Sequence, residues 1–268
     1  MNPISDTAYY CAGTRMLDAE SENPICGDDY ARCFMDEHGL AVLARFKQLE
    51  QHRIANLVRH RIIDELILGE LEKDPHTTIL VYGAGFDARA FRFSSGHWIE
   101  VDEPQIIDYK NTRLPQDRCR NRLARIAHRF GVDDLTGALS GHFGGGRIIV
   151  VVEGVLRYLE LQAVTDLIAT LQRLLPDHEL ICDLMNRAFS ETVASGSSEI
   201  INGMGASFRF LEEEPEAVFS RGGYGLLDKI SVVAYAIDAG LMKIPGDTPA
   251  IDPDVVLNGY SICRFAYP

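Results

Sequence analysis

The feature that most constrains this chain is a glycine turn that ends a buried strand. Apolar residues recur at three- and four-residue intervals across residues 53–73, which predicts a helix that Asp74 and Pro75 terminate. Residues 77–82 follow as a β-branched, apolar strand that runs into Gly83-Ala-Gly85, and a second helix is expected to leave the turn. Glycine allows a ligand to lie against the backbone at such a helix N-terminus, although an ordinary strand-to-helix turn has the same pattern.

Further strands alternate with helical patterns, which predicts an α/β protein with a parallel sheet covered on both faces. Residues 148–152 read Ile-Ile-Val-Val-Val, an uninterrupted apolar run that is typical of a central strand. A loop rich in Gly and Pro precedes the last strand and is too broken for a crossover helix, so the final two strands are expected to be antiparallel neighbours. Beyond 77–82, the expected strands are 97–101, 126–130, 147–152, 179–182, 230–237 and 259–265, with a helix over 160–175 among the connections.

One segment supports two readings. Four arginines could stripe one face of a helix, whereas the apolar and aromatic residues between them alternate as in a strand. The arginines would form the clearest basic patch of the chain, and a solvated face is favoured over an anion-binding surface. The arginines are Arg118, Arg122, Arg125 and Arg129, and the alternating residues are Ile126, His128 and Phe130.

Composition excludes several classes of protein. The chain has 268 residues, 46% of them hydrophobic, with 26 Lys and Arg against 39 Asp and Glu, so the net charge is −13. This is globular composition in one compact unit, without repeats or a linker. An acidic chain is a poor candidate for nucleic-acid binding, which depends on Lys and Arg at phosphates. The longest aliphatic run is far shorter than the roughly 20 residues that cross a bilayer, so no membrane span is expected.

The N-terminal residues show no basic and then apolar signal pattern, which predicts a cytoplasmic protein. Six cysteines are scattered without metal-ligand spacing, so we expect them to be reduced and expect no metal site. The oligomeric state cannot be read from these features.

Acidic residues follow three of the expected strands. Asp102 ends the strand after the glycine turn, where a carboxylate can accept hydrogen bonds from ribose hydroxyls. Asp134, followed by Leu135, comes after the next strand and could bond an adenine amino group or simply cap a helix. Glu153 follows the central strand. Ligands of open α/β sheets bind beyond the carboxyl ends of the strands, although solvated carboxylates would also suit these positions.

A nicotinamide dinucleotide and S-adenosylmethionine both require a glycine turn and a ribose-binding acid. The first would suit an oxidoreductase, but the chain lacks the Tyr-x-x-x-Lys pair of short-chain dehydrogenases; Tyr109 and Tyr260 have arginine four residues on. The antiparallel final strand pair favours a methyltransferase sheet. A methyltransferase-like protein that binds without catalysis stays a further alternative.

In these residues the chain resembles the leucine carboxyl methyltransferase family, which includes the tetracenomycin-type polyketide O-methyltransferases. The resemblance is strongest in VYGAGFDARAFR (81–92), EVDEP (100–104) and EGVLRYL (153–159), and it extends to RHRIIDE (59–65). It implies a Rossmann-like class I methyltransferase sheet with an antiparallel C-terminal strand pair, a helical N-terminal cap and a lid insertion. S-adenosylmethionine is the cofactor that it implies.

The resemblance also implies roles for single residues. Arg59 would hold the methionine carboxylate of the cofactor, which suits the bidentate geometry of a guanidinium. Gly83 and Gly85 would form the cofactor loop, Asp102 would bind ribose, and Glu153 would lie near the sulfonium and amino groups. Asp134 and Leu135 would lie on the adenine side.

The acceptor is expected to be a carboxylate of a small molecule or a peptide. A carboxylate is ionised at neutral pH and needs no general base for in-line attack on a methyl group, whereas a phenol or enol would need one. No histidine lies in the three strongest motifs, which favours the carboxylate. It would need a cation, and the candidates are Arg157, where many relatives carry an apolar residue, and Arg15, which could match an N-terminal family arginine.

Four segments of one methyltransferase domain are expected. Residues 74–185 would form the cofactor-binding core and residues 229–268 the C-terminal strands. Residues 1–73 would form a helical cap, and residues 186–228 a lid over the substrate. Phe208, Phe210 and Phe219 could line an apolar substrate site, with packed core as the favoured alternative.

Overall fold

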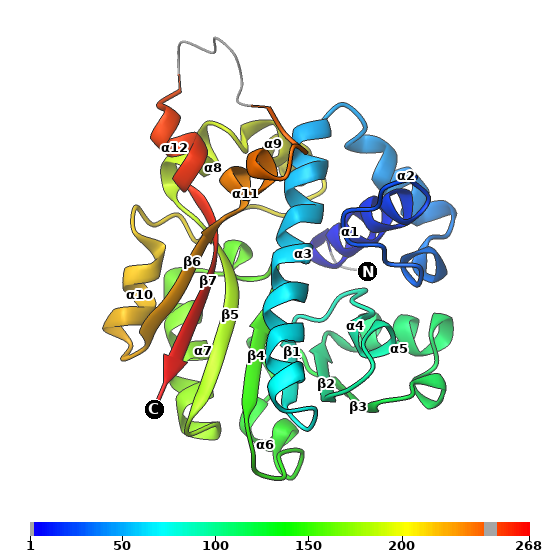
Figure 1. The fold of residues 1–268 in the computed structure, drawn as a ribbon, viewed down its shortest axis with the longest axis vertical. Coiled ribbons are helices and arrows are strands. Elements are labelled where there is room, and N and C mark those ends of the chain that lie inside the picture. The colour runs from blue at the N-terminus through cyan, green and yellow to red at the C-terminus, as the bar shows by residue number, and fades with distance from the viewer. Residues whose placement is uncertain (1–2, 244–250) are drawn as a thin grey trace.

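The structure is a computed structural model that describes residues 3–243 and 251–268, and a seven-stranded mixed sheet forms its centre (Figure 1). The strand order is β3-β2-β1-β4-β5-β7-β6. Pairs from β3 to β5 are parallel, and β7 runs antiparallel to both of its neighbours, as the sequence predicts. The strands are β1 (Thr78–Tyr82), β2 (His97–Asp102), β3 (Arg122–Ala127), β4 (Ile148–Val152), β5 (His178–Met185), β6 (Gly225–Ser231) and β7 (Tyr260–Tyr267).

Helices cover both faces of this sheet (Figure 1). On one face, α3 (Glu50–Lys73) and α11 (Val232–Asp238) bury apolar side chains against β1, β4, β5 and β7. On the other face lie α7 (Leu161–Leu174) and α10 (Pro215–Arg221). The other helices are α1 (Pro3–Ala19), η1 (Ala31–Phe34), α2 (Glu37–Arg45), α4 (Arg89–Arg92), α5 (Pro104–Arg113), η2 (Gln116–Arg118), α6 (Leu135–Leu139), η3 (Leu156–Tyr158), α8 (Arg187–Glu191), α9 (Ser195–Gly203) and α12 (Pro253–Asn258).

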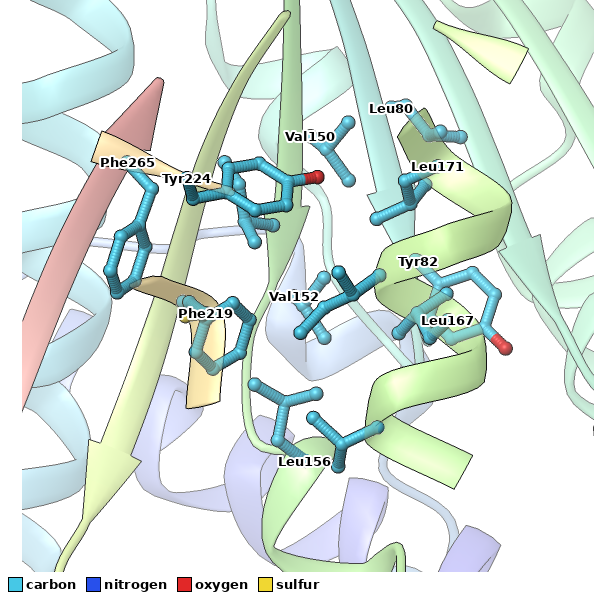
Figure 2. Packing of buried hydrophobic residues seen from close by; sticks show 14 of the residues in the cluster. Leu80, Tyr82, Val150, Val152, Leu156, Leu167, Leu171, Phe219, Tyr224 and Phe265 are labelled. Carbon is cyan, nitrogen blue, oxygen red and sulfur yellow. The ribbon is translucent and has the colours of Figure 1, made fainter. Parts of the chain in front are cut away.

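Figure 2 shows how the α7 face of the sheet is packed. Leu167 and Leu171 of α7 lie against Val150 and Val152 of β4, and all four are buried. Burial of a leucine side chain contributes about 2 kcal/mol to stability. These contacts hold the central strands rigidly, so the loops that follow the strands have fixed starting points.

The register of the parallel strands brings three chain positions to one edge of the sheet. Tyr82 pairs with Val101, and Val81 pairs with Val151, so β1, β2 and β4 end side by side. Gly83 follows β1, Asp102 is the last residue of β2, and Glu153 follows β4. A ligand site is therefore expected beyond this edge.

The strand expected at 126–130 is displaced. β3 occupies Arg122–Ala127, and it pairs with the whole of β2. The two-residue periodicity of a strand therefore describes this segment better than the helical periodicity. His128 and Phe130 lie beyond the end of the strand. Three of the four arginines are exposed, as a solvated face requires, whereas the side chain of Arg125 is fully buried against Glu100.

The strand expected at 230–237 is wrong for most of its length. β6 ends at Ser231, and helix α11 begins at the next residue. The Ser231 hydroxyl accepts a hydrogen bond from Ala234 N and caps this helix. Val232, Val233 and Ala236 are buried, and a short buried helix gives the same continuous apolar pattern as a strand. Helix α12 lies in the following connection, which was expected to be irregular loop; residues 244–250 of that connection lie outside the described residues.

The segment 1–73 divides into two parts. α3 packs directly on the sheet, while α1 and α2 pack on each other outside it (Figure 1). Within the described ranges, no helix is long and apolar enough to cross a membrane. Within the same ranges, no three His, Cys, Asp or Glu side chains cluster as metal ligands would.

Candidate functional site

A cavity of about 350 Å³ lies beyond the C-terminal ends of β1, β2 and β4. Helix α1 forms its roof, α3 closes one side, and the loops after the three strands form its floor. Its walls combine apolar side chains with charged ones. The lining residues are Ser5, Thr7, Ala8, Cys11, Arg15, Arg59, His60, Val81, Gly83, Ala84, Gly85, Phe86, Asp87, Asp102, Glu103, Ile106, Phe130, Glu153, Gly154, Val155, Tyr158 and Leu159.

The glycine turn requires glycine at Gly83 and favours it at Gly85. Gly83 has a φ of +74°, and a Cβ there would lie 2.2 Å from Val155 Cγ2. Gly85 has a φ of +44°, and its Cβ would touch the methyl group of Ala8 in α1. The backbone is therefore exposed to the cavity where side chains would otherwise fill it. The helix that follows is only the four-residue α4, shorter than the sequence pattern indicates.

Asp102 supports this turn from the end of β2. One carboxylate oxygen accepts a hydrogen bond from Gly85 N at 2.6 Å, and the other accepts one from Glu103 N at 2.7 Å. Burial raises the pKa of Asp102 to about 6, although these two backbone donors oppose the shift. Glu103 also lines the cavity, and it accepts a hydrogen bond from Phe130 N at 3.1 Å.

Glu153 lies at the centre of a buried cluster of charges beyond β4. Arg59 Nε lies 3.0 Å from one carboxylate oxygen, and Arg89 Nη1 lies 2.8 Å from the other. Burial by itself would raise the pKa of Glu153, but Arg89, His60 and Arg59 lower it well below its ordinary value. Glu153 is therefore an ionised carboxylate at neutral pH.

Charged side chains surround the His60 ring in this cluster. Arg92 Nη1 lies 3.1 Å from His60 Nε2, and Arg89 Nη2 lies 2.8 Å from Nδ1. A carboxylate oxygen of Glu153 lies 3.2 Å from the same Nδ1. Both ring nitrogens are thus committed to protein partners.

Sequence reasoning assigned no role to Asp87, Arg89 or Asp64. Asp87 lines the cavity, and its carboxylate pairs with the guanidinium of Arg89, which is fully buried. Burial would raise the pKa of Asp87, but Arg89 and other cations lower it to about 2. Arg89 Nε also donates to Asp64 at 2.5 Å. All three residues lie within segments that carried the family resemblance. That resemblance is the sequence signal that could have identified them.

Two arginines reach the cavity from the helical side. Arg59 comes from α3, and its Nη2 lies 3.8 Å from Cys11 Sγ. Arg15 comes from α1; its Nε donates to Asp28 at 2.9 Å and its Nη2 to Phe86 O at 2.8 Å. Of the residues expected in the site, the structure brings together Arg15, Arg59, Gly83, Gly85, Asp102 and Glu153.

Asp134 and Leu135 do not line this cavity. The Asp134 carboxylate caps α6, where it accepts hydrogen bonds from Thr136 N and Gly137 N at 3.0 Å each. Leu135 is buried in the core on the α7 side of the sheet. The helix-cap alternative therefore describes Asp134 in this structure.

Arg157 also lies outside the cavity wall. Its guanidinium pairs with Asp183 and donates to the Tyr260 hydroxyl at 2.8 Å, so it does not face the space where a substrate carboxylate would bind. Phe208 packs beside Arg157. Phe210 and Phe219 are buried core residues, which was the favoured alternative to lining a substrate site. Tyr158, next to Arg157, does line the cavity.

The arrangement suits a ligand that carries hydroxyl groups and charges of both signs. Acidic side chains follow all three strands, two arginines face them from α1 and α3, and the backbone at the glycine turn is open to close approach.

Known proteins resemble this chain in sequence and in fold. A family model described as leucine carboxyl methyltransferase matches residues 8–172. A putative S-adenosyl-L-methionine-dependent methyltransferase from Mycobacterium avium is 27% identical over 183 residues, which cover 60% of this chain. A relative with the same description from Mycobacterium marinum is 30% identical over 128 residues, 41% of each chain. The first of these matches spans 58% of the relative's length.

Solved structures share the fold. A DUF574 family protein from Streptomyces avermitilis has a TM-score of 0.60 at 13% identity, covering 94% of this chain and all of that one. A putative methyltransferase from Thermobifida fusca has a TM-score of 0.57 at 14% identity, covering 95% of this chain and 93% of that one. The sheet is therefore that of a class I methyltransferase.

Proposed function

The chain belongs to the leucine carboxyl methyltransferase family, and from that premise we propose that it transfers a methyl group from S-adenosylmethionine to a carboxylate oxygen of a small molecule or peptide. The observation that carries the proposal is the cavity itself. The glycine cradle, four acids and two arginines surround one space beyond the strand ends.

The residues present fit S-adenosylmethionine. The backbone at Gly83 and Gly85 is open where a Cβ would fill the space, which suits close approach of the methionine moiety. Asp102 and Glu103 can accept hydrogen bonds from ribose hydroxyls. Glu153 supplies negative charge for the amino and sulfonium groups, and Arg59 supplies donors for the methionine carboxylate. Asp134, which caps α6, and Leu135, which is buried in the core, are given no contact with the cofactor in this proposal.

Few groups are left to act as a general base. The bound cofactor supplies an electrophilic methyl group, so the chain has to position the acceptor and exclude water. His60 is the one imidazole among the cavity-lining residues, and both its nitrogens are engaged by Glu153 and Arg92. Asp102 and Glu103 lie at the ribose end. This favours an acceptor that is already ionised, which a carboxylate is at neutral pH.

Arg15 is the better of the two expected holders of the acceptor carboxylate, because it lines the cavity and Arg157 does not. Its position is fixed by Asp28 and by the carbonyl of Phe86. Tyr158 and the α1 roof would keep water away from the reacting oxygen. If Arg15 holds the acceptor, Arg15→Gln raises the acceptor KM more than the S-adenosylmethionine KM.

The class of protein is tested by calorimetric titration with S-adenosylmethionine, S-adenosylhomocysteine and NAD. We expect binding of the first two. A protein that binds NAD alone would be an oxidoreductase candidate, and a protein that binds the cofactor but methylates no acceptor would be a binding protein.

The acceptor class is tested with methyl-labelled S-adenosylmethionine and a panel of carboxylic acids, phenols and peptides with free or amidated C-termini. A methyl ester releases volatile methanol in mild base, whereas an aryl methyl ether does not. Base-labile label confined to the free carboxylates supports the proposal. Base-stable label on phenols would assign the protein to the hydroxyl methyltransferases.

A further inference from the structure

Behind the cavity, side chains from three elements meet at the hydroxyl group of Tyr260 in β7. Arg59 Nη1 of α3 donates to this oxygen at 3.3 Å, and Arg157 Nη2 of η3 donates at 2.8 Å. The hydroxyl in turn donates to Asp183 Oδ2 of β5 at 3.1 Å. The oxygen thus accepts two hydrogen bonds and gives one, which is the full capacity of a phenol.

The charges of this group are buried and balanced locally. The side chains of Arg59, Arg157 and Asp183 are 5%, 11% and 1% exposed. Burial would raise the pKa of Asp183, but Arg157, Arg59 and the N–H of Gly154 lower it below its ordinary value. A buried charge that loses its partner is costly, so the four groups hold one another in a single arrangement.

The same group fixes the part of Arg59 that faces the cavity. Gly154, which lines the cavity, packs on the Arg59 guanidinium; a Cβ there would lie 3.5 Å from Nη1 and Nη2. Gly154 N donates to Asp183 Oδ1 at 2.6 Å. Asp183 therefore holds both the loop after β4 and, through Tyr260, the arginine beside it.

Arg157 extends the group to the segment that was expected to form the lid. Its guanidinium lies over the ring of Phe208 at 5.4 Å and over the ring of Tyr260 at 5.3 Å. Its backbone oxygen accepts hydrogen bonds from Arg209 N at 2.8 Å and Phe210 N at 3.4 Å. A change in the position of residues 208–210 would therefore be transmitted to Tyr260 through Arg157.

We propose that Tyr260, together with Asp183 and Arg157, is a positioning group for Arg59 that couples the conformation of residues 208–210 to the cofactor site. None of these three side chains lines the cavity, so each acts through Arg59 and not by contact with the cofactor. The inference rests on the proposed function, in which Arg59 holds the methionine carboxylate.

Tyr260→Phe tests the hydroxyl while keeping the ring, which packs in the core beside Phe189. Loss of the hydrogen bonds should raise the KM for S-adenosylmethionine and the Kd for S-adenosylhomocysteine about 3- to 10-fold, with a smaller change in kcat. Tyr235→Phe is the matched control, because the Tyr235 hydroxyl donates to the exposed Glu65 and Tyr235 does not line the cavity. A purely structural role would lower the melting temperature without this selective change in KM.

The outcomes separate the two proposals. A wild-type protein that does not bind S-adenosylhomocysteine overturns the proposed function. A wild type that binds it, with a Tyr260→Phe variant that binds it equally well, overturns only the positioning role. If Tyr260→Phe fails to fold, Arg157→Met carries the same test, because Arg157 donates to the same hydroxyl.

The link to residues 208–210 is tested by a double-mutant cycle with Phe208→Leu and Arg157→Met. If the two side chains act through one network, the fold-change in Kd of the double variant is smaller than the product of the single fold-changes. A fold-change equal to that product overturns the coupling. An unchanged Kd in Phe208→Leu overturns it as well.

Discussion

At the scale of single residues, Asp102 gives the site a pH dependence. Its pKa is raised to about 6 by burial, and the ribose hydroxyls of the cofactor would donate to its ionised form. Protonation below pH 6 removes that acceptor, so the Kd for S-adenosylhomocysteine should rise as pH falls, by at most about tenfold per pH unit. Calorimetric titration between pH 5 and 8 measures this dependence.

Asp102→Asn is the control for that titration. It cannot ionise, so its binding should be weaker at pH 8 and nearly flat with pH. A wild-type Kd that stays constant down to pH 5, or an Asn variant with the same slope as wild type, would contradict the assignment of the pH dependence to Asp102.

Gly83 should not tolerate a side chain. Gly83→Ala places a Cβ 2.2 Å from Val155 Cγ2 at a φ of +74°, so both a clash and backbone strain are expected. Together they should destabilise the protein by roughly 2–4 kcal/mol and abolish cofactor binding. Thermal unfolding and calorimetry check both effects.

Gly69→Ala is the matched control, because nothing lies within 4 Å of a Cβ at Gly69 in helix α3. It should stabilise the helix by up to about 1 kcal/mol. An alanine that is accepted at both positions would show that the glycine turn has no special requirement.

Four of the six predicted residues that meet in the cavity share one property, whereas Arg15 and Arg59 came from the family resemblance. Gly83, Gly85, Asp102 and Glu153 follow directly from strand ends, and a strand end can be predicted from local pattern. The partners of Glu153 cannot, because Arg59 is 94 residues away in sequence and is brought near only by the packing of α3 on the sheet. For the same reason the sequence does not reveal that Arg157 is paired, because its partner Asp183 is 26 residues further along the chain.

At the scale of elements, α1 is the roof of the cavity. Ala8, Cys11 and Arg15 recur at three- and four-residue intervals, so one face of the helix looks into the site. A ligand held under this face should reduce the local opening of α1. We expect S-adenosylhomocysteine to slow hydrogen exchange of the α1 amides, while α10, which lines none of the cavity, exchanges as before.

Hydrogen exchange followed by mass spectrometry measures this element by element. Protection confined to the loops after the strands, with none in α1, would show that α1 does not close over the ligand.

The elements that sequence reasoning placed incorrectly are those whose surroundings decide their form. Residues 230–237 carry a continuous apolar pattern, and the structure forms a strand before Ser231 and a helix after it. The serine cap and the contact of α11 with α3 settle the choice, and neither is visible in a local window. By contrast, the central strand at 148–152 was predicted to the residue over its apolar run, because it is buried on both faces.

At the scale of the whole molecule, the acidic surplus is only partly surface charge. Asp64, Asp87 and Glu153 are ionised inside the protein, and Arg89 touches all three. Arg89 is fully buried and lies where α3, α4 and the loop after β4 meet. It therefore joins the sheet, the helical layer and the site into one electrostatic unit.

The ion pairs of this unit make the free energy of unfolding depend on pH. The pKa values of Asp64, Asp87 and Glu153 are lowered in the folded protein, that of Asp87 to about 2. Their stabilisation is complete above the unfolded values near pH 4 and is lost as pH falls toward 2. The raised pKa of Asp102 acts in the opposite sense between about pH 4 and 6, where stability decreases as pH rises.

Arg89→Met should remove the unit while filling the same space. Three buried carboxylates would lose a shared cation, so the free energy of unfolding should fall by at least about 3 kcal/mol at pH 7. The pKa values of those carboxylates should rise, and the variant should therefore lose less of its remaining stability between pH 4 and 2 than the wild type does. Arg61→Met, which breaks an exposed pair with Glu65, should cost about 0–1 kcal/mol. Urea unfolding of both variants at pH 7, 4 and 3 measures these differences, and equal losses in the two variants would mean that the buried cluster contributes no more than a surface ion pair.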